Sequence, residues 1–72
     1  MEKNQIGTEI KKYRKLAGLT QEQLAEKCGL KGKYIISMYE RGTRLPTLDK
    51  TLPKICDVLG IDFDVVFRKK GG

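Results

Sequence analysis

The sequence predicts an all-α fold, a compact bundle of five short helices. Three observations predict it. Apolar side chains recur at helical spacing, first at Ile6, Ile10, Tyr13 and Ala17. Glycines follow the apolar stretches where helices usually end, and good capping residues precede several of them. The stretch that also fits an alternating strand, residues 62–67, would have no strand to pair with.

The length of the chain, 72 residues, indicates one domain. We expect residues 1–4 to be a flexible N-terminus, residues 5–67 to form the folded domain, and residues 68–72 to be a basic, flexible tail. No apolar run approaches the roughly 18 residues of a membrane helix, and the N-terminus has no apolar block typical of an export signal. The expected location is therefore the cytoplasm, with no membrane partner.

The two cysteines, Cys28 and Cys56, are predicted to be core residues rather than ligands. They lie far apart in a chain that has no histidine, which excludes the usual zinc-binding spacings. Disulfides are rare in the cytosol, and free cysteine is among the most buried residue types. No metal and no cofactor is expected.

The net charge of +6 is high for so small a domain. It favours an anionic partner, nucleic acid before a membrane surface. Solubility is the alternative explanation, since many small domains carry a similar charge.

The first helix is predicted over residues 5–17, with Gly18 ending it. The second begins after Thr20, which is a good N-cap and stands three residues before Gln23, as in a capping box. Gly29 ends this second helix.

The third helix is predicted over residues 33–41, "KYIISMYER", between Gly32 and Gly42. It follows the second helix after only a few residues. Two helices joined by a short turn that contains glycine form a helix-turn-helix.

The fourth helix is predicted over residues 52–59, with Thr51 as N-cap and Gly60 ending it. Pro53 dictates this start, because proline is tolerated in the first turn of a helix but not in its interior. Residues 62–67, "DFDVVF", are predicted to form a short fifth helix with Asp62 as N-cap.

Four segments in this order, "TQEQLAEKCG", "ISMYERG", Pro46 and "LPKICDVLGI", resemble the phage-repressor and Cro-like (Xre-type) helix-turn-helix family. That family typically shows Thr-Gln-x-x-Leu-Ala, a glycine, Ile-Ser-x-x-Glu-x-Gly, a proline and a Leu-Gly-[Val/Ile] ending. The match spans about residues 6–67. It implies a DNA-binding domain of lambda-repressor-like type, whose third helix reads the major groove of double-stranded DNA.

The resemblance also implies roles for individual residues. Phosphate contacts are expected at Gln21, Arg41, Thr43 and Arg44. Exposed N–H groups and the helix dipole at the start of the second helix would favour the contact at Gln21. Arg14 and Glu40 match a buried ion pair that ties the first helix to the end of the third, which is a structural role.

The chain departs from the family pattern by one extra residue in "GLKGKYIIS" and another in "PTLDKT". The first insertion precedes the reading helix and leaves two registers open. If the helix is anchored at its C-terminal end, Ile36 and Tyr39 face the core and Gly32 becomes the N-cap. The turn then absorbs the extra residue.

In the other register the helix is anchored at the turn, Ile35 and Met38 face inward, and Lys31 becomes the N-cap. Lysine is a poorer cap than glycine. This register also moves Glu40 away from Arg14. The first register is therefore favoured.

In the favoured register the exposed reading positions are Lys33, Tyr34, Ser37 and Met38, with Lys31 in the turn before them. Lys33 can donate to guanine or to a phosphate, and Ser37 to almost any base. Tyr34 can bond a phosphate or pack on a thymine methyl, and Met38 offers only apolar contact. Each has a simpler alternative as helix surface, turn or core edge. Arg, Asn and Gln are absent here, so we expect modest specificity and an affinity dominated by phosphate contacts.

The predicted function is that of a sequence-specific, repressor-like transcriptional regulator. The chain lacks the residue sets that general acid–base or covalent catalysis requires, so neither an enzyme nor a small-molecule substrate is expected. The alternative is a protein-interaction module of the same fold, antitoxin-like or a phage control protein. Such domains usually act as dimers on two half-sites. The candidate dimer surface is the C-terminal helix, with Val65, Val66 and Phe67, and a monomer or a weak dimer is the alternative.

Overall fold

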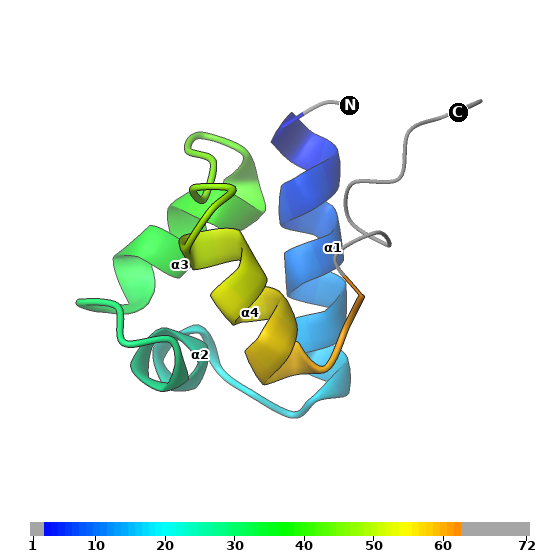
Figure 1. Cartoon of the computed structure of the whole chain (residues 1–72), viewed down its shortest axis with the longest axis vertical. Helices are drawn as coiled ribbons and strands as arrows, with labels where there is room; N and C mark the ends of the chain where they lie inside the picture. The colour runs from blue at the N-terminus through cyan, green and yellow to red at the C-terminus, as the bar shows by residue number, and fades with distance from the viewer. Residues whose placement is uncertain (1–2, 63–72) are drawn as a thin grey trace.

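Four α-helices surround a small apolar core in the computed structural model, which describes residues 3–62 (Figure 1). They are α1 (Lys3–Leu16), α2 (Gln21–Lys27), α3 (Lys33–Arg41) and α4 (Thr51–Leu59). Helix α3 packs against both α1 and α2, and α4 contacts the same two helices. All regular secondary structure in the described residues is helical, which confirms the predicted fold class. None of these helices is long and apolar enough to cross a bilayer.

The centre of the core contains side chains from all four helices. The largest fully buried side chains are Ile10 of α1, Leu24 of α2, Ile36 of α3, and Leu52 and Ile55 of α4. Burying one such side chain stabilises a fold by about 1.5–3 kcal/mol. Because every helix supplies at least one of them, no helix can leave the bundle without exposing the core.

Helix α1 differs from its prediction at both ends. It begins at Lys3 rather than at residue 5. It ends at Leu16, and Ala17, which was predicted to lie on the apolar stripe, is exposed. The N–H of Ala17 still donates to the main-chain oxygen of Tyr13 over 3.0 Å, and Gly18, with a left-handed φ of 73°, turns the chain directly after it.

Gly7 lies where α1 and α3 approach each other. A Cβ atom at this position would lie 2.7 Å from the main-chain oxygen of Glu40 and closer still to that of Tyr39. The two backbones can therefore approach this closely only because position 7 has no side chain. An interior helical glycine often has such a packing reason, and the local patterns considered above do not predict it.

Helix α2 is capped as predicted. The main-chain N–H of Gln23 donates to Oγ1 of Thr20 over 3.0 Å, and the N–H of Thr20 donates to Oε1 of Gln23 over 2.9 Å. This reciprocal pair satisfies two N–H groups that a helix start leaves unpaired. The capping box is confirmed.

Helix α3 adopts the register anchored at its C-terminal end. Ile36 and Tyr39 are buried, and Gly32 is the N-cap. Ile35 packs only at the edge of the core, and Met38 is half-buried. The turn before α3 thus takes up the extra residue, and the register anchored at the turn is wrong.

Helix α4 begins one residue earlier than predicted, and Thr51 is not its N-cap. Thr51 is the first helical residue, and Lys50 in the cap position makes no side-chain cap bond. Thr47 supplies the missing acceptors instead. Its Oγ1 accepts the N–H of Thr51 over 3.0 Å, and its main-chain oxygen accepts the N–H of Leu52 over 2.8 Å. The loop folds back to cap the helix, which a local capping pattern does not predict.

The prediction of a fifth helix at residues 62–67 falls almost entirely outside the described residues, as do the strand alternative, the dimer surface at residues 65–67 and the tail at 68–72. Asp62, the expected N-cap, is described and is exposed. The structure therefore describes four helices rather than five within residues 3–62.

Candidate nucleic-acid interface

One side of α3 faces away from the bundle. The buried residues of α3 are Ile36, Tyr39 and Glu40, and they mark the side of the helix that faces the bundle. At 100° per residue, Tyr34 and Met38 fall on the opposite side. The side chain of Tyr34 is 74% exposed, and Met38 is half-buried. The outward side thus contains two of the four predicted reading positions, of which Tyr34 is the more exposed.

The other two predicted reading residues, Lys33 and Ser37, lie one helical turn apart beside this outward side. Lys33 is exposed and Ser37 is half-buried. The Nζ of Lys33 lies 5.8 Å from the centre of the Tyr34 ring. An ammonium at this distance is attracted to the face of an aromatic ring, so the contact helps to hold both side chains in place.

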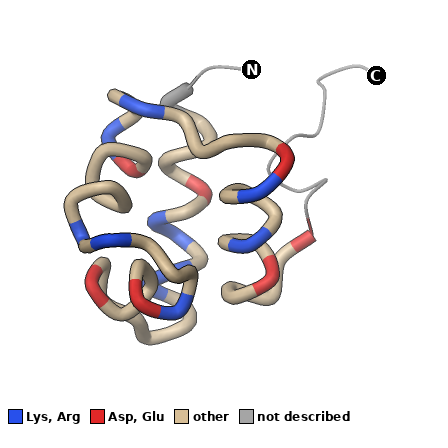
Figure 2. Tube along the Cα trace, turned by 60° about the vertical axis from the view of Figure 1, so that its left-hand side comes forward, with Lys and Arg blue, Asp and Glu red and all other residues tan. Residues whose placement is uncertain are grey.

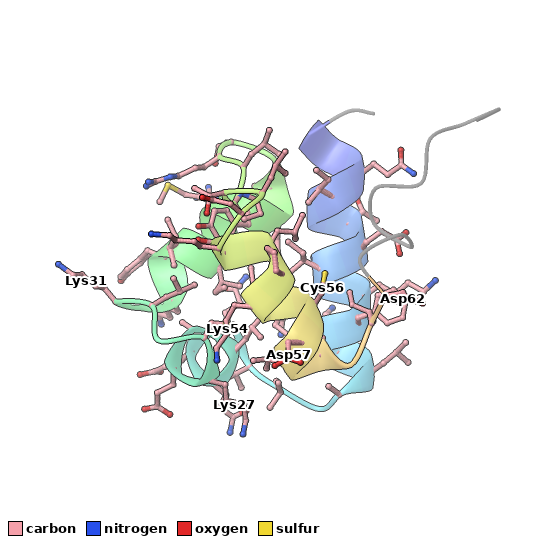
Figure 3. All side chains as sticks on the ribbon, in the orientation of Figure 1. Lys27, Lys31, Lys54, Cys56, Asp57 and Asp62 are labelled. Carbon is pink, nitrogen blue, oxygen red and sulfur yellow. The ribbon has the colours of Figure 1, made fainter. Side chains whose placement is uncertain are left out.

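Basic side chains lie at both ends of α3, and Figure 2 marks the charged positions along the trace. Lys31 and Lys33 are exposed at its start, and Arg41 and Arg44 at its end. Lys31 projects from the turn before α3, away from the helices (Figure 3). Positive charge spread along such a face is typical of surfaces that meet a phosphate backbone.

Glu40 does not cancel this positive charge. The Nε of Arg14 donates to its Oε2 over 2.6 Å, and Nη2 of Arg14 donates to its Oε1 over 3.2 Å. Both residues are only 8% exposed. Arg14 therefore balances the one carboxylate of α3 inside the fold, in the pair that the family resemblance implies.

Gln21 is tied to the same carboxylate. Its Nε2 donates to Oε1 of Glu40 over 3.0 Å, and its side chain is half-buried. An amide nitrogen carries two hydrogens, so one remains for a phosphate. Local sequence patterns do not predict this bond. The signal that could have found it is that a bidentate guanidinium fills only two of the roughly four acceptor sites of a carboxylate.

A polar hollow of about 450 Å³ lies where α1, α2 and α3 meet. It is lined by Arg14, Leu19, Thr20, Gln21, Glu22 and Lys33. The structure thus brings Gln21 and Lys33, two predicted DNA contacts from different helices, to one place on the surface. Glu22 lies at the same hollow and would oppose an anion there.

Thr43 is engaged within the protein. Its main-chain N–H and its hydroxyl both donate to the main-chain oxygen of Met38, over 3.0 and 3.2 Å. The N–H of Arg44 approaches the same oxygen at 3.4 Å. The main-chain N–H groups of Thr43 and Arg44 are therefore already used in bonds to the end of α3. The side chains of Arg41 and Arg44 are exposed beside Thr43, and the Nε of Arg41 donates to the main-chain oxygen of Ser37 over 3.5 Å.

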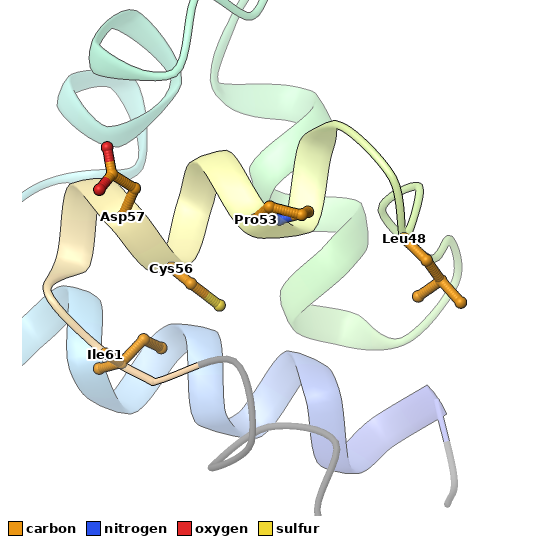
Figure 4. Close-up of a pocket in the computed structure, with 5 residues that line it drawn as sticks. All are labelled: Leu48, Pro53, Cys56, Asp57 and Ile61. Atoms are coloured by element: carbon orange, nitrogen blue, oxygen red, sulfur yellow. The ribbon is translucent and has the colours of Figure 1, made fainter.

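A second hollow of about 490 Å³ lies beside α4 (Figure 4). It shares no lining residue with the polar hollow between α1, α2 and α3. It is lined by Leu48, Pro53, Cys56, Asp57 and Ile61. The lining is mostly apolar, so this hollow does not suit a phosphate.

Cys28 and Cys56 are free and buried, as predicted. Burial raises the pKa of both thiols above the ordinary value of 9.0, and at Cys28 the charge of Lys54 opposes part of this rise. The thiols are therefore neutral core groups near neutral pH.

The family model HTH_3, described as helix-turn-helix, matches residues 10–66. This chain belongs to the HTH_3 helix-turn-helix family. The match covers all of α2, α3 and α4, and the C-terminal half of α1. It therefore confirms the resemblance found in the sequence. No curated protein matches this helix-turn-helix domain significantly.

Several solved structures share the fold of this helix-turn-helix domain. The N-terminal DNA-binding domain of SinR from Bacillus subtilis is 32% identical, with a TM-score of 0.79, and the match covers 96% of this chain and 99% of that one. SinR in complex with DNA is 34% identical, with a TM-score of 0.77 and coverages of 86% and 97%. A mutant of the restriction-modification controller protein C.Esp1396I is 37% identical, with a TM-score of 0.78 and coverages of 94% and 87%.

Proposed function

We propose that this chain, a DNA-binding transcriptional regulator of the helix-turn-helix family, places α3 in the major groove and acts as a repressor. The observation that carries the proposal is the outward side of α3. It combines exposed side chains with basic residues at both ends of the helix, while its one acid is buried in an ion pair. The relative SinR has been solved bound to DNA.

The proposed contacts fall into two groups. Lys33, Tyr34, Ser37 and Met38 would face the bases. Gln21, Lys31, Arg41 and Arg44 would contact phosphates on either side of the groove, and Thr43 would only support the end of α3. Because phosphate contacts carry no sequence information by themselves, specificity rests on the first group.

The decisive experiment is selection from a pool of random duplex DNA at near-physiological salt, followed by sequencing of the retained molecules. An enriched inverted repeat supports a base-reading dimer, and the spacing of its half-sites gives the dimer geometry. A single enriched half-site supports a base-reading monomer. Binding without enrichment, lost as salt rises, would contradict the proposed groove contacts and favour the protein-interaction module.

Two variants separate the two groups of contacts. Lys33→Ala should weaken binding to the selected site more than to unrelated DNA. Gln21→Ala should lower the affinity for all sequences by a similar factor, because a lost phosphate contact is independent of sequence. Lys15→Ala, which removes an exposed lysine on α1, is the matched control. If all three variants bind like the parent chain, α3 and Gln21 do not contact DNA.

Repression is tested separately, in a reporter whose promoter carries the selected site. We expect the reporter signal to fall when the protein is present and to recover with Lys33→Ala. A rise in the reporter signal would identify an activator with the same DNA site.

A further inference from the structure

We propose that Tyr34 and Met38 read DNA through the methyl groups of two thymines, so that the half-site of this regulator is defined by apolar contacts. This inference rests on the proposed placement of α3 in the major groove. It names the chemical feature of the DNA that the outward side of α3 recognises.

Tyr34 is the first apolar reader. Its side chain is 74% exposed and lies in the first turn of α3. The ammonium of Lys33 lies 5.8 Å from the centre of its ring. The high exposure leaves much of the ring surface open. An aromatic side chain has only two χ angles, so it offers a flat apolar surface at low entropic cost.

Met38 is the second apolar reader. It follows Tyr34 by four residues on the outward side, and residues with this spacing are neighbours on a helix surface. Its main-chain oxygen accepts bonds from Thr43, which hold the last turn of α3 in place. Its thioether chain cannot donate a hydrogen bond to a base edge. The two side chains together form an apolar strip along the exposed side of α3.

The spacing of the strip matches DNA. Four residues of α-helix rise about 6 Å, whereas successive nucleotides of one strand are about 3.4 Å apart. Tyr34 and Met38 would therefore meet different base pairs, within about two base steps of each other.

The major groove offers one apolar group, the C5-methyl of thymine. Thymine also presents its O4 acceptor, but its methyl group gives the strip an apolar contact. Guanine, cytosine and adenine present only donors and acceptors in the groove, so under the strip they would lose contact with water and gain no apolar contact. Lys33 and Ser37, beside the strip, can bond to neighbouring bases. The predicted half-site thus contains two thymines, flanked by a base such as guanine that accepts from lysine.

The experiment replaces each thymine of the selected half-site, one at a time, by deoxyuridine. This change removes only the methyl group. We expect an affinity loss of about fourfold at two positions, the factor that corresponds to burying one methyl group. Tyr34→Ala should abolish the methyl preference at one of these positions, and Met38→Ala at the other.

Two further variants complete the design. Tyr34→Phe keeps the ring and loses the hydroxyl, so it should keep the methyl preference. Leu16→Ala is the matched control, because Leu16 is an exposed apolar residue of α1, with 73% exposure, outside the proposed interface. It should change neither affinity nor preference.

The outcomes separate this inference from the proposed function. If selection enriches a site but deoxyuridine substitution has no effect, the methyl inference is wrong and base reading by α3 stands. If Tyr34→Phe and Tyr34→Ala behave alike, the hydroxyl of Tyr34 acts instead, and the inference is again overturned. If selection enriches no site, the proposed function itself fails.

Discussion

The guanidinium of Arg14 in α1 and the carboxylate of Glu40 in α3 form a buried ion pair, with Nε and Oε2 2.6 Å apart. A second bond joins Nη2 to Oε1, and a third joins Nη1 of Arg14 to the main-chain oxygen of Leu19 over 2.8 Å. Every buried side-chain nitrogen or oxygen of the described residues has a hydrogen-bond partner. The pair fixes the end of the proposed reading helix against α1.

Removing one partner of this pair should destabilise the fold strongly. Arg14→Ala leaves a buried carboxylate without its cation, and losses of about 3–5 kcal/mol are typical of such a change. Urea unfolding followed by circular dichroism measures the effect. A double variant, Arg14→Met with Glu40→Leu, should lose less than Arg14→Ala, because it leaves no unpaired charge. An unchanged midpoint for Arg14→Ala would refute the stabilising role of the pair.

Gly7→Ala should also destabilise the fold, through overpacking. The new Cβ would lie 2.7 Å from the main-chain oxygen of Glu40, so α1 and α3 would have to separate. Overpacking of this kind costs roughly 1–3 kcal/mol. The melting temperature is the readout. Gly32→Ser is the control, since nothing lies within 4 Å of a Cβ at position 32, and serine is a good N-cap. Equal melting temperatures for the two variants would contradict the close approach at Gly7.

The two buried thiols should make stability depend on alkaline pH. Burial raises the pKa of Cys28 and Cys56 above 9.0, so the folded state holds these protons more tightly than the unfolded state does. Their contribution is present below the unfolded pKa and is lost as pH rises through the folded pKa. Stability should therefore fall above about pH 9.

A variant with both Cys28→Ala and Cys56→Ala tests this linkage. It should lose less stability than the parent chain between about pH 8 and pH 10, measured as the change in the urea midpoint. The two proteins share every other ionisable group, so the difference between them isolates the thiols. An identical change in the two proteins would show that the thiols do not contribute.

Arg44→Ala should reduce the salt dependence of DNA binding. The guanidinium is exposed in the turn after α3, where we propose a phosphate contact. Losing one such contact makes the slope of log affinity against log salt less steep by about 1, and it weakens binding to all sequences by a similar factor. Fluorescence anisotropy over a salt series gives the slope. Lys12→Ala, on the exposed side of α1, should leave it unchanged, and equal slopes for all three proteins would remove Arg44 from the interface.

The sequence by itself determined the features that depend on neighbouring residues. The capping box of Thr20 and Gln23 and the left-handed glycine after α1 involve residues within one helical turn, so local chemistry predicts them. The register of α3 followed in part from a local choice, because glycine is a better cap than lysine. The other part was the family resemblance, since only this register lets Glu40 meet Arg14.

Only the tertiary structure decided the contacts between distant residues. The bond from Gln21 to Glu40 joins positions 19 residues apart, and the close approach at Gly7 depends on how α1 crosses α3. Such contacts depend on the packing of whole helices, which no local pattern contains. For the same reason the sequence could name Gln21 and Lys33 as candidate contacts from different helices, but only the packing of those helices brought them to one hollow on the surface.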